Sequence, residues 1–124
     1  MLVVYCYDLG VGVYEIDSSG GLVYKQTIPT SSPMDNLWIA PDGSVYAAGH
    51  PSAWRFMLAI WYPSMAKQYP PCSEVLSLAP NAYAFEQRYL DEGRQFMGSS
   101  IAVLWDKNIL VGSPTGNLME CHRI

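Results

Sequence analysis

Short apolar runs separated by turn residues dominate this chain, and they constrain its fold more than any other feature. Nine prolines and ten glycines are spread over the 124 residues, so few windows are long enough for an uninterrupted helical period. The runs between these breaks are strand-length and rich in Val, Ile, Leu and Tyr: "LVVYCYDL", "GVGVYEID", "LVYKQTI", "NLWIA", "VYAAG", "SIAVLW", "ILVGS" and "LMEC". The pattern predicts an all-β protein built from antiparallel hairpins.

The middle of the chain is harder to assign. "WRFMLAIWY", residues 54–62, fits either a buried strand or one apolar helical turn, and "PSMAKQYPPCS" after it predicts a loop punctuated by proline. "SEVLSLAP" and "QRYLDEGRQF" predict two outer strands, the second bent at Gly93. We therefore expect little helix anywhere. Core positions, or contacts between packed sheets, are expected for the tryptophans, which are Trp38, Trp54, Trp61 and Trp105.

Charge and hydropathy exclude several classes of protein. The formal net charge is −4, and the seven Lys and Arg residues are scattered, so no nucleic-acid partner is expected. No run approaches the roughly 18 apolar residues that cross a bilayer, so no transmembrane segment is predicted. "MLVVYCYDLG" lacks the basic and small-residue signals of a secretory leader, but a chain without its true N-terminus would lack them too, so localisation stays open.

The three cysteines, Cys6, Cys72 and Cys121, lie far apart in the sequence. No clustered Cys/His spacing of the kind that binds zinc is present. The odd number leaves at least one thiol free or paired outside this chain, and Cys121, close to the end, is the natural candidate. An equally good interpretation of Cys6 and Cys72 is that they are small buried apolar residues.

One hairpin combines strand signals with polar ends. In "MDNLWIAPDGSVYAAGHP", residues 34–51, the turn "PDGS" folds the chain back, so Asp35 and Asn36 at its start are expected near His50 at its end. Two interpretations stay open on the residues alone. The polar ends are either a site or ordinary strand-start residues that bond the nearby backbone.

The hairpin has a partial counterpart later in the chain. "WIAPDGSVYAAGHP" and "VLWDKNILVGSP" share an apolar strand, an acidic turn carrying Asp42 or Asp106, a second apolar strand and a Gly-x-Pro end. Recurring strand-turn-strand units are typical of propeller blades. Two partial units cannot close a ring, so we expect an arc with open strand edges.

At this point the residues resemble a known family. "MDNLWIAPDGSVYAAGHP", "SEVLSL" and "GSSIAVLWDKNILVGSPTGNLMEC" are similar to the carboxy-terminal portion of the serum paraoxonase/arylesterase family, from about residue 13 onward. These proteins are calcium-dependent lactone and ester hydrolases built as six-bladed β-propellers. The resemblance implies a single partial, open propeller domain of about two blades. Its parts would be the end of one blade (about 1–33), one blade (34–97) and C-terminal strands that close the ring (98–124).

The resemblance also implies roles for the polar ends of the hairpin. The family's Asp-Asn pair supplies two oxygen ligands to the central calcium, which implies metal ligation by Asp35 and Asn36. Calcium takes six to eight oxygen ligands, so these two residues would be only part of its shell. The histidine of the family's Gly-His-Pro segment lines the mouth of the active site, which implies that place for His50.

Further residues are implied in the same way. Cys121 matches a cysteine that bonds a partner near the family's N-terminus, and that partner lies outside this chain. A secreted location follows from the same resemblance. The family's catalytic histidine pair and first-blade acidic ligand also lie outside this chain, which leaves the catalytic base unidentified. Pocket-wall positions of the family fall on Met57, Ser100 and Pro114.

The resemblance thus implies a C-terminal fragment of a calcium-dependent arylesterase or lactonase acting on a small ester or lactone. We expect the isolated chain to be inactive and to associate with the missing upstream blades. One alternative is a non-catalytic β-rich interaction module whose open edges pair with another chain. Another is a fragment of a strictosidine-synthase-like or gluconolactonase-like propeller, which shares the architecture but not necessarily the ester chemistry.

Overall fold

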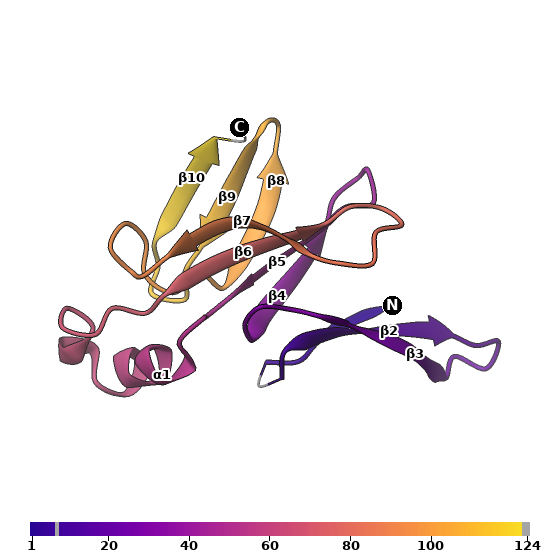
Figure 1. Cartoon of the computed structure of the whole chain (residues 1–124), viewed down its shortest axis with the longest axis horizontal. Helices are drawn as coiled ribbons and strands as arrows, with labels where there is room; N and C mark the ends of the chain where they lie inside the picture. The colour runs from indigo at the N-terminus through magenta and orange to yellow at the C-terminus, as the bar shows by residue number, and fades with distance from the viewer. Residues whose placement is uncertain (7, 123–124) are drawn as a thin grey trace.

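The computed structural model describes residues 1–6 and 8–122, and within them the fold is all-β. The ten strands of these described residues form three antiparallel sheets, which Figure 1 shows following one another along the chain without closing into a barrel. This confirms the prediction of an all-β, partial and open propeller. Turn residues separate the strands as expected, for example Gly20 and Gly43, whose φ angles of 84° and 85° suit a residue without a side chain.

The first sheet, indigo to purple in Figure 1, contains β1 (Leu2–Val4), β2 (Gly10–Ile16) and β3 (Leu22–Pro29) in sequence order. Asp17 organises the turn between β2 and β3, because its carboxylate accepts hydrogen bonds from the backbone N–H groups of Ser19 and Gly21, both at 2.8 Å. A hydrogen bond from the Ser19 hydroxyl, together with these backbone bonds, lowers the pKa of Asp17. The sheet therefore ends in a well-defined hairpin.

The second sheet is a complete antiparallel meander of four strands: β4 (Met34–Ile39), β5 (Val45–Gly49), β6 (Ser73–Leu78) and β7 (Glu86–Asp91). The prediction that "SEVLSL" is an outer strand was wrong in part. All six residues of β6 are buried, because β6 lies between β5 and β7 and is covered on both faces. Strand β7 is at the edge as predicted, and the chain turns after it at Gly93, which has a φ of 88°.

The third sheet, orange to yellow in Figure 1, contains β8 (Ile101–Trp105), β9 (Asn108–Gly112) and β10 (Leu118–His122). The predicted turns "DKN" and "PTGN" connect these strands. Strand β9 lies between the other two, so β10 has a partner on one side only. The last strand of the described chain thus presents an open edge.

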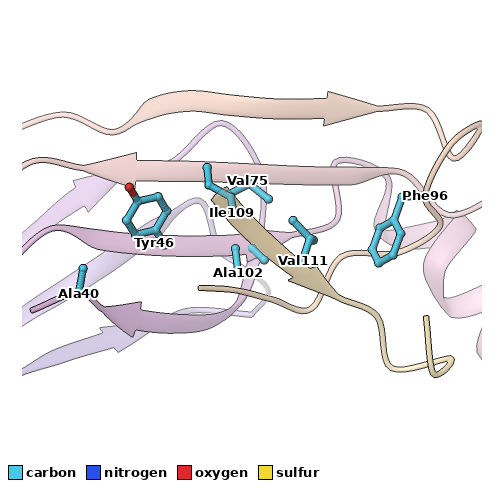
Figure 2. Packing of buried hydrophobic residues seen from close by; sticks show 8 residues of the cluster. Ala40, Tyr46, Val75, Phe96, Ala102, Ile109 and Val111 are labelled. Atoms are coloured by element: carbon cyan, nitrogen blue, oxygen red, sulfur yellow. The ribbon is translucent and has the colours of Figure 1, made fainter. Parts of the chain in front are cut away.

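The largest core lies where β8 and β9 pack against the second sheet. Figure 2 shows Tyr46 and Val75 of the second sheet gathered with Ile109 and Val111 of β9. Smaller clusters join the first sheet to the second, such as Ile28 of β3 with Val45 and Leu78. Adjacent sheets are therefore held by apolar contacts, the non-directional force expected between neighbouring blades.

The expectation of little helix is confirmed for the described residues, and the segment left open between strand and helix is helical. Helix α1 (Ala53–Trp61) and the 3₁₀ turn η1 (Pro63–Met65) fill the connection between β5 and β6. The nine helical residues contain no Gly or Pro and include Arg, Met, Leu and Ala, which favour a helix. Pro63 ends it, because the residue before a proline is pushed out of the helical conformation.

The tryptophans divide into two groups. Trp38 packs against the main core, whereas Trp54, Trp61 and Trp105 are largely exposed. Ala59 is the only fully buried residue of α1, so this helix lies on the surface of the described chain. Among the described residues, no helix is long and apolar enough to span a membrane.

Candidate functional site

The β4–β5 hairpin brings its two polar ends together. Its turn closes through a hydrogen bond from Gly43 N to the carbonyl oxygen of Ala40 at 2.9 Å, far from the strand ends. Register then places Met34 opposite Gly49. The backbone N–H of His50 donates to the carbonyl oxygen of Pro33 at 3.1 Å, so His50 lies directly beside the start of β4.

A β-bulge aims Asp35 and Asn36 to the same side of the sheet. Neighbouring residues of a regular strand point to opposite faces, but the register of β4 shifts between Met34 and Asn36. Both side chains consequently reach Ser100. The Asn36 amide nitrogen donates to the carbonyl oxygen and the hydroxyl of Ser100, at 3.0 and 3.2 Å, and the Ser100 hydroxyl donates to the Asp35 carboxylate.

Ser100 is itself held from two sides. Its backbone N–H donates to the carbonyl oxygen of Gly112 at 2.8 Å, which ties it to the end of β9. The preceding residue, Ser99, is fully buried, and its hydroxyl donates to the carbonyl oxygen of Gly49 at 2.8 Å. The third sheet therefore fixes the hydroxyl that positions the Asp-Asn pair on the second.

A cavity of about 240 Å³ opens beside this pair. Strand β4, the segment after β5, helix α1 and the segment after β1 all contribute to its wall, which is mainly apolar. Three of the residues predicted for the site lie here, namely Asp35, His50 and Met57. The full set that lines the cavity is Cys6, Pro33, Met34, Asp35, His50, Ala53, Phe56 and Met57.

His50 is the most unusual polar group of the cavity. The residue is 8% exposed, and its ring stacks on Phe56 with 3.6 Å between the ring centroids. Neither ring nitrogen has a hydrogen-bond partner in the described chain. Burial lowers the pKa of His50, and the negative charge of Asp35 opposes that shift without cancelling it. A neutral imidazole at the cavity wall is available to a ligand as donor or acceptor.

Two predicted residues lie elsewhere. Pro114 is exposed in the turn between β9 and β10, and it does not line the cavity. Cys121 lies on β10 opposite Ile109, half-buried, and burial raises the pKa of its thiol. All three cysteines are free thiols in the described chain, so the predicted bond of Cys121 to an outside partner stays a prediction.

The sequence analysis missed Glu74, a carboxylate that is 1% exposed on β6. It accepts hydrogen bonds from Ser31 at 2.7 Å, from Gln87 at 2.5 Å and from the hydroxyl of Ser32. Ser31 and Ser32 precede β4, so Glu74 anchors the segment that leads into the Asp-Asn pair. The signal was a charged residue inside the apolar run "SEVLSL", because acidic residues are almost never fully buried unless paired.

Comparison with known proteins places the chain in a family. The family model described as Arylesterase matches residues 4–122, which is nearly the whole chain. The chain belongs to the arylesterase family. Among curated relatives, this arylesterase-family chain is similar to serum paraoxonase/arylesterase 2 of Gallus gallus, with 25% identity over 119 residues. It is also similar to serum paraoxonase/arylesterase 2 of Rattus norvegicus, with 26% identity over 126 residues.

The alignments cover most of this chain but only part of each relative. The alignments include 93% and 96% of this chain but only 32% and 34% of the two relatives. The chain therefore spans about a third of the length of the curated relatives that it matches.

The donor set of this family member fits part of a calcium site. Asn36 uses its amide nitrogen for Ser100, which leaves the amide oxygen as a potential ligand, and Asp35 keeps a second carboxylate oxygen. Hard oxygen donors of this kind suit calcium. The described residues contain no group of three or more His, Cys, Asp or Glu side chains that could hold a metal ion. A complete shell would thus require ligands beyond those described.

Proposed function

We propose that this chain forms the C-terminal part of a calcium-dependent hydrolase of small esters or lactones. The observation that carries the proposal is the bulge in β4, which turns Asp35 and Asn36 to one side, where Ser100 holds both beside an apolar cavity. A strand that merely began with polar residues would not need this arrangement. Membership of the arylesterase family supports the reaction class.

Asp35 and Asn36 would contribute two oxygen ligands, and upstream residues would complete the shell. Bound calcium supplies a Lewis acid that polarises the ester carbonyl and stabilises the developing oxyanion. Ser100 orients both ligand side chains through its hydrogen bonds. The negative charge of Asp35 would then be offset by the cation, which removes the cost of leaving it partly desolvated.

The cavity would hold the apolar part of the substrate. Phe56 and Met57 supply an apolar wall, and His50, just after β5, offers a polar contact. Pro114 would reach the substrate only as part of a wall completed by upstream residues, because it lies in an exposed turn. The mainly apolar lining favours small esters or lactones over charged substrates.

The rest of the enzyme would associate along the open edges of this arc. Residues 1–33 would end one blade, 34–97 would form the next and 98–124 would close the ring. Trp105 and Leu118, 69% and 71% exposed, would be covered in that assembly, and Cys121 would bond a cysteine outside this chain. Such a disulfide fits a secreted enzyme. The isolated chain would be inactive, because most ligands and the catalytic base are missing.

A second candidate is a non-catalytic module that pairs through its open strands. The unpartnered edge of β10 favours it, since exposed edges bind other strands by main-chain hydrogen bonds. A module of this kind has no use for calcium, so metal dependence separates the two candidates.

The test compares two variants in a protein that carries the upstream blades. Asn36→Ala should weaken calcium binding by about tenfold or more and lower the rate of ester hydrolysis in parallel. Asp42→Ala, in the turn at the far end of the same hairpin, should alter stability by about 1 kcal/mol or less and leave both functions intact. Calcium titration and ester hydrolysis are the two measurements. Full calcium affinity in Asn36→Ala would overturn the proposed ligand role.

A further inference from the structure

Cys6 is a thiol in the wall of the same cavity. It lies just after β1, it is exposed, and it lines the cavity with Asp35, His50 and Met57. The sequence shows no sign that Cys6 lies near the β4–β5 hairpin, because 27 residues stand between Cys6 and Met34. Contact between β1 and β4 brings the two segments together. The cavity thus holds a nucleophile that the proposed calcium chemistry does not use.

His50 gives independent evidence that a polar ligand group belongs in this cavity. Its imidazole is more than nine-tenths buried, and both ring nitrogens lack partners among the described residues. A buried polar atom without a partner is costly, so such groups usually meet a ligand or a water molecule. An imidazole has at least one N–H donor in either protonation state, so it can donate to a carbonyl oxygen.

We propose that this cavity binds apolar esters or lactones so that Cys6 becomes their covalent acyl acceptor. The His50 N–H donates to the carbonyl oxygen of the ligand, and the apolar wall formed by Phe56 and Met57 holds its acyl chain. The ligand class is shared with the proposed function. The thiol chemistry uses only residues of this chain and needs no metal.

The step balances without a co-reactant other than water. The Cys6 thiol releases its proton to water, and its Sγ forms a bond to the carbonyl carbon. The C–O bond to the leaving oxygen then breaks, and that oxygen takes up a proton from water. The products are a thioester on Cys6 and a free alcohol; a lactone instead leaves a hydroxyacyl chain attached. No oxidation or reduction occurs.

The experiment treats the 124-residue chain with p-nitrophenyl butyrate in the presence of a calcium chelator, at a protein concentration low enough to keep it monomeric. Intact-mass and peptide spectrometry should find one butyryl group on Cys6, removable by hydroxylamine. Iodoacetamide, which is small and polar, measures the exposure of each thiol. For each thiol we divide the rate of acylation by the ester by the rate of alkylation by iodoacetamide. This ratio should be at least about tenfold higher for Cys6 than for Cys121, because the cavity orients the ester.

Two variants test the cavity itself. His50→Phe keeps an aromatic ring against Phe56 but removes the N–H, and it should slow acylation of Cys6 by about tenfold. Met57→Trp should slow it by filling the cavity. Neither change should alter alkylation of Cys6 by iodoacetamide. Equal ester selectivity of Cys6 and Cys121, or unchanged acylation in both variants, overturns the proposal. Because calcium is absent throughout, these outcomes are independent of the proposed calcium-dependent hydrolysis.

Discussion

At the scale of the residue, the buried side chain of His50 makes the stability of the folded protein depend on pH. Burial lowers its pKa, so the folded protein holds fewer protons on His50 than the unfolded chain does. Its contribution to stability is therefore complete above the unfolded pKa of about 6.5 and is lost progressively as the pH falls below that value.

We expect the His50 imidazole to titrate below pH 6.5 by NMR. We also expect the free energy of unfolding to fall on acidification, and His50→Phe should reduce that fall. Urea titrations at several pH values measure the effect. A titration of His50 at or above the value of the unfolded chain would show that Asp35 outweighs burial.

Glu74 is a second residue whose environment makes a sharp prediction. Glu74→Leu removes the acceptor of three buried or part-buried donors, from Ser31, Ser32 and Gln87. We expect a loss of about 3 kcal/mol or more, because each stranded donor costs desolvation energy. Glu74→Gln keeps the volume but replaces one acceptor oxygen by a donor, so we expect a smaller loss of about 1.5 kcal/mol. Urea unfolding of a protein carrying the upstream blades is the measurement.

Glu86→Gln provides the matched control. Glu86 lies on β7, its side chain is 68% exposed, and it pairs with Arg88 at 2.7 Å. An exposed ion pair contributes little, so we expect a change of less than about 1 kcal/mol. If Glu74→Leu were as mild as Glu86→Gln, the carboxylate would not anchor the segment before β4.

At the scale of the element, the β4–β5 hairpin depends on a close approach at Gly49. A Cβ added there would lie 2.2 Å from the carbonyl oxygen of Pro33 and 2.9 Å from Cα of Met34, both backbone atoms. Gly49→Ala should therefore push β4 away from β5 and destabilise the protein by about 3 kcal/mol. Since Asp35 follows Met34, the proposed calcium binding should weaken as well in a protein that carries the upstream blades.

Gly112→Ala, on β9, is the comparison for this element. There a Cβ would meet one side-chain methyl, Cγ2 of Ile101 at 2.9 Å, which can move more easily than backbone. We expect a clearly smaller loss of stability from Gly112→Ala, read from the same thermal unfolding experiment. Equal losses in the two variants would mean that the hairpin tolerates displacement at Gly49.

At the scale of the whole molecule, the three sheets form an arc with unsatisfied edges. Strand β10 has one partner, and large apolar side chains such as Trp61, Trp105 and Leu118 are each more than half exposed. We expect the isolated chain to self-associate at micromolar concentrations, because open edges and apolar patches drive pairing. It should bind calcium no tighter than about 1 mM and hydrolyse phenyl acetate no faster than buffer.

Light scattering, calcium titration and an esterase assay on the purified chain test this expectation. On the proposed function, adding upstream blades should abolish self-association and produce calcium-dependent turnover together. A monomeric isolated chain with calcium-dependent esterase activity would contradict both the proposed fragment and the proposed ligand count.

The sequence by itself determined the strand-rich fold and most hairpins, whereas the candidate ligands came from the family resemblance and stay a prediction. Alternating apolar runs and turn residues act over short stretches of chain, so "PDGS" and "DKN" could be assigned without knowledge of distant neighbours. The proximity of Asp35, Asn36 and His50 followed in the same way from one hairpin. The alternatives left open for residues 54–62 show the limit, because a short apolar run has no period that separates strand from helix.

Only the tertiary structure decided what these residues meet. Ser100, directly before β8, reaches Asp35 and Asn36 on the second sheet, and Cys6, just after β1 of the first sheet, enters the cavity. Glu74 is buried because β6 is covered on both faces, a fact that depends on strand order rather than on local pattern. Contacts between residues far apart in sequence arise from packing of whole sheets, and local periodicity carries no information about which sheets pack.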